Sequence, residues 1–90
     1  MSQVIDKQDN STAKPLALLK KHGMSVRGVA RGLGYSDSTV RDVLDPGEFG
    51  RVSHRKLIRA RNRIEALLSA AGEDVTDLWA EYDSQLEDAA

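Results

Sequence analysis

Several residue types that build particular kinds of site are scarce or missing in this sequence. The 90 residues include no cysteine, which excludes disulfides, zinc–thiolate sites and a cysteine nucleophile. Aromatic residues make up 4% of the chain, so the core is expected to be aliphatic. No apolar run approaches the roughly 18 residues of a membrane-spanning helix, and no basic–apolar–small secretory signal stands at the N-terminus. We therefore expect a soluble cytoplasmic protein with one small core.

Charge of one sign is missing from two long stretches of the chain. Residues 51–63 carry six Lys and Arg and no acid, whereas residues 64–90 carry eight acids and no Lys or Arg. Residues 14–63 as a whole carry 12 Lys and Arg against four Asp and Glu, a regional charge of +8 that the net charge of −1 conceals. A phosphate backbone meets local charge, so this block favours nucleic-acid binding. A solvated helix face is the alternative interpretation of residues 51–63.

Hydrophobic spacing and capping residues predict an all-α chain with five helices. No stretch shows the sustained alternation of a half-buried strand. The expected helices cover residues 14–22, 26–33, 37–45 and 54–71, and a fifth starts near Asp74 or Thr76. Serine residues stand directly before three of them, where their side chains can accept hydrogen bonds from the first turn: Ser25, Ser36 and Ser53.

The last two expected helices supply much of the apolar surface. Residues 54–71 place apolar side chains three and four residues apart, and Ile58 and Leu68 widen that face. The fifth helix is expected to bury Val75, Leu78, Trp79, Tyr82 and Leu86. These faces can cover the preceding helices. They also leave room for a homodimer through the same two helices, with a monomer as the alternative.

Residues 26–45, VRGVARGLGYSDSTVRDVLD, hold two short expected helices joined by a turn that contains Gly34. Such a pair crosses steeply and lets its second helix project. Ala30 is small where the helices are expected to cross, and Gly34 tolerates positive φ in the turn. Gly28 and Gly32 either allow close packing or weaken the first helix. The inner face is apolar: Val29, Leu33, Tyr35, Val40 and Val43.

This pattern resembles the helix-turn-helix of the lambda-repressor-like (Cro-type) DNA-binding family, and the whole chain is loosely similar to small phage Ner-like regulators. The resemblance covers about residues 14–80 and includes the ending EDVTDLW, residues 73–79. It implies a five-helix lambda-repressor-like domain with the helix-turn-helix at the second and third helices and a long fourth helix. It also implies that the helix at 37–45 enters the major groove of double-stranded DNA.

The resemblance implies two sets of DNA-contacting residues. Candidates for base contacts lie on the expected recognition helix: Asp37, Ser38, Thr39, Arg41 and Asp42. Arg41 is the strongest of them, because a guanidinium pairs bidentately with the O6 and N7 atoms of guanine. Contacts to the phosphate backbone are expected from Arg27, Ser36, Arg51, His54, Arg55, Lys56 and Arg59. Two features depart from the family pattern: three Asp residues on the recognition helix, and Val26 at a position that is often polar.

Neither catalysis nor a bound metal, cofactor or small-molecule ligand is predicted. His22 and His54 lack acidic or histidine partners at metal-ligand spacing. Ser53 and Lys56 have the S-x-x-K spacing of a serine nucleophile, but the companion groups of such a site are missing. Ser53 is better explained as a helix cap.

The predicted organisation is a flexible arm over residues 1–12, a DNA-binding domain over 13–80 and an acidic tail over 81–90. The tail is interpreted as a frayed, solvated end, or as a competitor that covers the basic surface or recruits a protein. The favoured function is a sequence-specific transcriptional regulator of the phage or mobile-element repressor type, associated with the nucleoid when bound. The alternatives are a protein-interaction or antitoxin-like module and a DNA-binding accessory factor in replication or transposition.

Overall fold

The computed structural model describes residues 13–89, with side chains described up to Ser84. These residues form α2 (Lys14–Lys21), α3 (Val26–Leu33), α4 (Asp37–Leu44), α5 (His54–Ala70), α6 (Ala80–Ala89) and the short 3₁₀ helix η1 (Phe49–Arg51). No strand occurs in this part of the chain, so the predicted all-α class is confirmed. The first four helices agree with the prediction to within one residue at each end. The predicted arm, residues 1–12, lies outside the described residues.

Three helices begin at serine caps, as predicted. Ser25, Ser36 and Ser53 each accept a hydrogen bond from the backbone N–H three residues ahead, at 3.0, 3.2 and 3.4 Å respectively. Replacing such a cap by alanine costs about 1 kcal/mol. α3 ends at Gly34, whose φ of +76° lies in the left-handed region that favours glycine. These local signals fix where the short helices start and turn.

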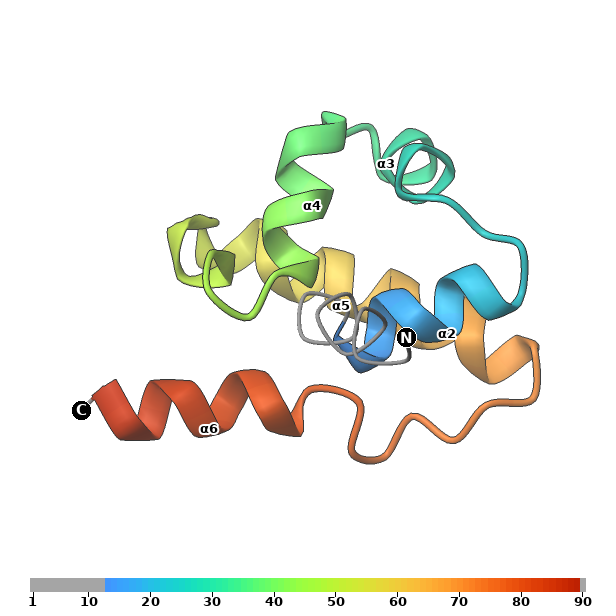
Figure 1. Ribbon diagram of the computed structural model, residues 1–90. Helices are drawn as coiled ribbons and strands as arrows, with labels where there is room; N and C mark the ends of the chain where they lie inside the picture. The colour runs from blue at the N-terminus through green and yellow to red at the C-terminus, as the bar shows by residue number, and fades with distance from the viewer. Residues whose placement is uncertain (1–12, 90) are drawn as a thin grey trace, which may run out of the picture.

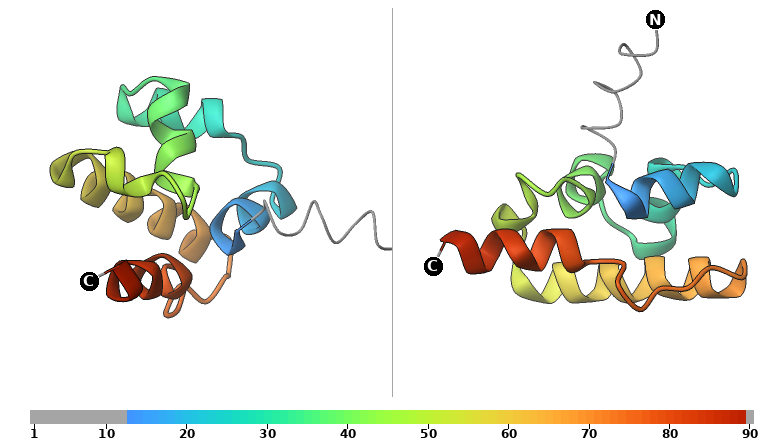
Figure 2. Two further views of the ribbon diagram at one scale, coloured as in Figure 1. Left: turned by 60° about the vertical axis from the view of Figure 1, so that its left-hand side comes forward. Right: turned by 60° about the horizontal axis from the view of Figure 1, so that its bottom comes forward.

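α5 is the central helix, and α2, α3 and α4 each pack against it. Figure 1 views α3 along its axis while α4 runs across the picture, so these two short helices cross steeply. α6 runs beside α5, as Figures 1 and 2 show. α5 therefore presents one face to the α3–α4 pair and another to α6, and α6 also touches the end of α4 through Tyr82 and Leu44.

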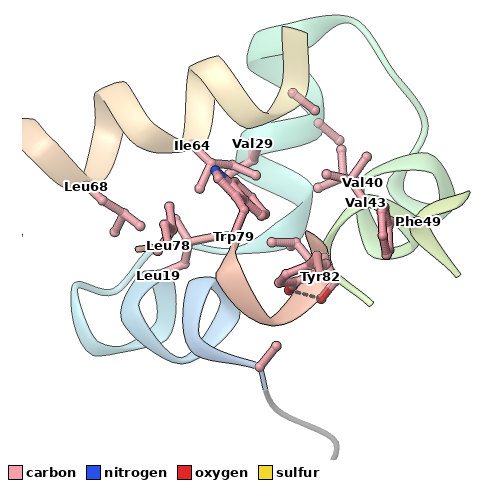
Figure 3. Packing of buried hydrophobic residues seen from close by; sticks show 14 residues of the cluster. Leu19, Val29, Val40, Val43, Phe49, Ile64, Leu68, Leu78, Trp79 and Tyr82 are labelled. Atoms are coloured by element: carbon pink, nitrogen blue, oxygen red, sulfur yellow. Dashed lines mark hydrogen bonds between the residues drawn. The ribbon is translucent and has the colours of Figure 1, made fainter. Parts of the chain in front are cut away.

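The hydrophobic core draws on all five α-helices and η1 (Figure 3). Its buried side chains are Ala13, Leu19, Val29, Ala30, Val40, Val43, Leu44, Phe49, Ala60, Ile64, Leu68, Leu78, Trp79 and Tyr82. Phe49 and Trp79 both meet the ring of Tyr82 edge-on, with centroids 5.4 and 5.2 Å apart. The expectation of an aliphatic core is therefore incomplete, because three of the four aromatic residues lie inside it.

The predicted start of the fifth helix is wrong, because α6 begins at Ala80. The Asp74 carboxylate accepts a hydrogen bond from the Thr76 N–H at 3.0 Å, and this bond lowers the pKa of Asp74. The following residues form tight turns closed by bonds three residues apart, such as Ala80 N–H to the Asp77 carbonyl at 3.2 Å. The apolar residues that suggested an earlier helix are buried from these turns instead.

The predicted boundary between the domain and an acidic tail at residue 81 falls inside α6. Tyr82 is fully buried, and its hydroxyl donates a hydrogen bond to the Leu44 carbonyl at 2.6 Å. Burial raises the pKa of this hydroxyl above its usual range. Residues 81–84 therefore belong to the folded domain rather than to a frayed end. Leu86, also expected in the core, lies beyond the described side chains.

Two residues of α5, Ile58 and Arg61, differ in exposure from what the sequence suggested. Ile58 was expected to widen the buried face, but it is 41% exposed. The Arg61 side chain is only 13% exposed, and its guanidinium carbon lies 4.7 Å from the centre of the Trp79 ring. Arg61 also lies over the rings of Phe49 and Tyr82, at 5.4 and 5.7 Å. One cation of the basic run is thus largely enclosed against the aromatic side chains of the core.

Candidate nucleic-acid interface

The exposed face of α4 carries all five predicted base-contacting residues. Val40, Val43 and Leu44 point into the core and fix the orientation of this eight-residue helix. Ser38 and Arg41 are exposed on the other side. The remaining three, Asp37, Thr39 and Asp42, are half-buried. A helix this short depends on its buried stripe for stability, so the same stripe determines which side chains face outward.

The five residues do not form one cluster, because three of them, Arg41, Thr39 and Asp42, border two different hollows. Arg41 lines a hollow of about 190 Å³ together with Leu16 of α2, Val26 of α3, and Leu44 and Asp45. Thr39 and Asp42 line a second hollow of about 160 Å³ on the side of α5. The structure therefore places Arg41 at one edge of the exposed strip and Thr39 and Asp42 at the other.

The second hollow joins α4 to the loop and helix that carry the basic run. Its lining residues are Thr39, Asp42, Arg51, Val52, Ser53 and Lys56. Two predicted base contacts thus lie beside two predicted phosphate contacts, Arg51 and Lys56. The N-terminal turn of α5 also opens here, and its free backbone N–H groups carry partial positive charge.

Hydroxyl groups gather at the start of α4. The Ser36 Oγ atom lies 3.2 Å from the Ser38 Oγ and 2.9 Å from the Thr39 Oγ1, besides capping the helix. Arg27, at the start of α3, donates from its Nε to the Asp37 carboxylate at 3.4 Å. Because the Arg27 side chain is 73% exposed, a phosphate would compete with Asp37 for it from solvent.

Tyr35 lies between the α3–α4 turn and the basic side chains of α5. The Lys56 Nζ atom is 5.7 Å and the Arg59 guanidinium carbon 6.0 Å from the centre of its ring. One turn further along α5, a Cβ atom at Gly32 would stand 3.1 Å from the Arg63 Nη2. The absence of a side chain at Gly32 therefore leaves room for Arg63. This places Lys56, Arg59 and Arg63 along the side of α5 that faces the α3–α4 pair.

Acidic residues partly offset the positive charge of this surface. Arg51 donates from its Nη1 to the Glu48 carboxylate at 2.9 Å. This hydrogen bond and the charge of Glu48, with a smaller contribution from Asp42, raise the pKa of Arg51 above its ordinary value. His54 and Arg55, the remaining predicted phosphate contacts, are exposed in the first turn of α5.

One polar cluster elsewhere in the molecule was missed at the level of sequence. The His22 Nε2 lies 2.6 Å and the Lys21 Nζ 2.9 Å from the same Glu73 oxygen. Hydrogen bonds from His22 and then Lys21 lower the pKa of Glu73. His22 therefore has an acidic partner in the fold, although none stands at metal-ligand spacing in the sequence. His22 and Glu73 are 51 positions apart in the sequence, so no local motif connects them.

Several other features bear on the class of protein. Among the side chains that the structure describes, up to Ser84, no group of three or more His, Cys, Asp or Glu is arranged to hold a metal ion. No helix in the described part of the chain is long and apolar enough to cross a membrane. No protein-family model, curated protein or solved structure matches this chain. The resemblance of residues 14–80 to the lambda-repressor-like family therefore stays a prediction.

Proposed function

We propose that this protein is a sequence-specific, double-stranded DNA-binding transcriptional regulator, in which α3 and α4 form a lambda-repressor-like helix-turn-helix. The observation that carries the proposal is the hollow shared by Thr39 and Asp42 of α4 with Arg51 and Lys56. A short projecting helix beside a cationic surface is suited to binding in the major groove, because the helix can contact base edges while the basic side chains contact the flanking phosphates.

In the proposed complex, α4 lies in the major groove. Arg41 pairs with a guanine from the edge of α4 that borders α3, and Ser38 and Thr39 offer hydroxyls to base or phosphate. Asp42 accepts a hydrogen bond from a cytosine amino group. Arg55, Lys56 and Arg59 bind phosphates beside the groove. Six phosphate contacts would give a slope of about −5 for log affinity against log salt concentration.

The regulator would act by occupying its operator and excluding polymerase, without catalysis. A homodimer through α5 and α6 is less favoured than at the level of sequence. Ile64 of α5 and Tyr82 of α6, which such an interface would have used, are fully buried within one chain. Among the side chains that the structure describes, these helices expose little apolar surface apart from Ile58 for a stable obligate interface.

A protein-interaction module is the second candidate, and one observation favours it. Asp42 of α4 and Asp45, which follows the helix, border the two hollows beside α4, where a phosphate backbone would repel them. A surface that mixes both signs of charge suits a polypeptide partner. In this alternative the α3–α4 pair serves as a scaffold for another protein.

The proposal is tested by fluorescence anisotropy on a pool of random 30-base-pair duplexes, with bound DNA recovered and sequenced. We expect steep salt dependence and an enriched motif. Lys56→Ala should weaken binding to all sequences alike and reduce the salt slope by about one. Lys20→Ala, an exposed lysine of α2, removes the same charge away from α4 and is the matched control.

Arg41→Ala provides the second arm, because a lost base contact relaxes one position of the motif, whereas a lost phosphate contact relaxes none. Absence of binding at about 50 mM salt, where phosphate contacts are strong, would contradict the proposal and favour the protein-interaction module. Binding that depends steeply on salt concentration but enriches no sequence motif would instead indicate an accessory factor.

A further inference from the structure

The side chains that would meet phosphates on α5 differ in how they are supported. Lys56 and Arg59 stand three residues apart on one face of the helix and converge on the ring of Tyr35. Arg55, in the same turn as Lys56, is exposed on the solvent side of the helix. A cation over an aromatic face is attracted by the ring quadrupole out to about 6 Å. Both distances, 5.7 and 6.0 Å, fall in that range.

Tyr35 itself is firmly placed. It follows Gly34 in the turn and precedes the cap Ser36, and its N–H donates to the Ala30 carbonyl at 3.0 Å. Its half-buried side chain packs against the core. The ring is therefore a fixed surface at the junction of α3, α4 and α5.

The position of Lys56 links this ring to α4. Lys56 lines the same hollow as Thr39, in the first turn of α4, while its Nζ stands over the ring of Tyr35. Long basic side chains lose rotamer freedom when they bind a phosphate. A ring that already restricts them lowers that cost, which is the general advantage of preorganisation.

We propose that Tyr35 is a positioning residue that holds Lys56 and Arg59 in place beside the first turn of α4, ready for a DNA phosphate. This inference rests on the proposed DNA-binding function. Tyr35 touches no phosphate in it and acts only through the two cations. Because the ring restricts both side chains before binding, its loss should weaken DNA binding about fivefold, the scale of the ordering cost of one long side chain.

A double-mutant cycle tests the coupling between the ring and the cations. Tyr35→Leu should weaken binding about fivefold in the wild type and in an Arg55→Ala background. It should have no further effect once Lys56 and Arg59 are both alanine. Tyr35→Phe retains the ring and should bind as the wild type does. Tyr35→Met replaces Tyr35→Leu if the leucine variant fails to fold, as judged by circular dichroism.

A measurement without DNA checks the contact itself. Ring currents should shift the proton resonances of the Lys56 side-chain methylenes, and this shift should persist in Tyr35→Phe and vanish in Tyr35→Leu. If the wild type binds DNA but Tyr35→Leu weakens binding equally in every background, the positioning role is overturned and the proposed function is not. The same holds if Tyr35→Phe binds as weakly as Tyr35→Leu. A wild-type protein that binds no duplex overturns the proposed function and this inference with it.

Discussion

Two sides of α5 hold basic side chains in opposite ways. Toward the α3–α4 pair, Lys56 and Arg59 stay exposed beside the single ring of Tyr35. Toward α6, the guanidinium of Arg61 is enclosed by the rings of Phe49, Trp79 and Tyr82. Arg59 and Arg61 are only two residues apart, but they lie on different faces of the helix. The face on which each residue lies, and not the local density of charge, therefore determines whether its side chain is exposed or enclosed.

The difference separates a surface that we propose binds DNA from one that stabilises the fold, within one basic run. On the exposed side, Lys56 and Arg59 contact the one ring of Tyr35 and remain open to solvent. The enclosed side fastens α6 to the rest of the chain: Arg61 donates to Asp83 at 3.3 Å, and the Trp79 indole N–H donates to Glu65 at 2.7 Å. The predictions below test whether the two sides can be disturbed separately.

The largest expected effect is on the enclosed side, at Tyr82. Replacing this fully buried side chain by alanine should lower the free energy of unfolding by about 3–5 kcal/mol, since truncation of a buried aromatic leaves a cavity. Tyr82→Phe removes only the hydroxyl that donates to the Leu44 carbonyl and should cost about 1 kcal/mol. Urea unfolding followed by Trp79 fluorescence measures both. Equal stability of the two variants would contradict the packing described for α6.

Arg61 should show the next largest effect. Arg61→Ala removes a desolvated cation from three rings and should lower the free energy of unfolding by about 2 kcal/mol. Nε and Nη2 of Arg61 are buried with no hydrogen-bond partner in the described residues, so ring contacts and Asp83 supply its known interactions. Unfolding of Arg61→Lys provides the control, because it keeps the charge. A variant Arg61→Ala as stable as the wild type would show that the enclosure is not stabilising.

The Glu73 cluster should make stability depend on pH. The hydrogen bonds from His22 and Lys21 lower the pKa of Glu73 in the folded state. The resulting stability is present above the ordinary carboxyl pKa of about 4.3 and is lost as the pH falls through the lower folded value. We expect the urea midpoint of the wild type to drop more between about pH 5 and pH 3 than that of Glu73→Gln. Parallel curves for the two proteins would contradict the assignment.

The smallest effect is expected on the exposed side, at Asp37. Asp37→Asn releases Arg27 from its 3.4 Å contact and removes one negative charge from the start of α4. Affinity for random duplexes should rise about two- to threefold, the scale of an exposed ion pair. Anisotropy at low salt measures the change, with Asp77→Asn, an exposed acid after α5, as the control for net charge. An unchanged affinity would show that Asp37 does not restrain Arg27.

Local signals in the sequence were sufficient for the α3–α4 pair and for the start of α5. Serine caps and apolar spacing act within a few residues, so Ser36 and Val40 already predict where α4 starts and which side it buries. The exposure of Ser38 and Arg41 follows from the same pattern.

The remaining features depend on contacts between distant segments. Arg61 is enclosed only because η1 and α6 bring their aromatic residues to it, and spacing within residues 51–63 carries no sign of this. The turns at Asp74 delay α6 to Ala80, although the apolar pattern alone would start a helix earlier. The separation of Arg41 from Thr39 likewise depends on how α2 and α5 flank α4.

Comparison of Arg59→Ala with Arg61→Ala tests most directly the claim that α5 divides its cations between a proposed DNA-binding face and the face that packs against α6. Duplex affinity and the free energy of unfolding are measured for both variants under conditions in which each is folded. Arg59→Ala should lose duplex affinity and keep its stability, whereas Arg61→Ala should lose stability and keep its affinity. Equal losses of affinity in the two variants at equal stability would contradict the account.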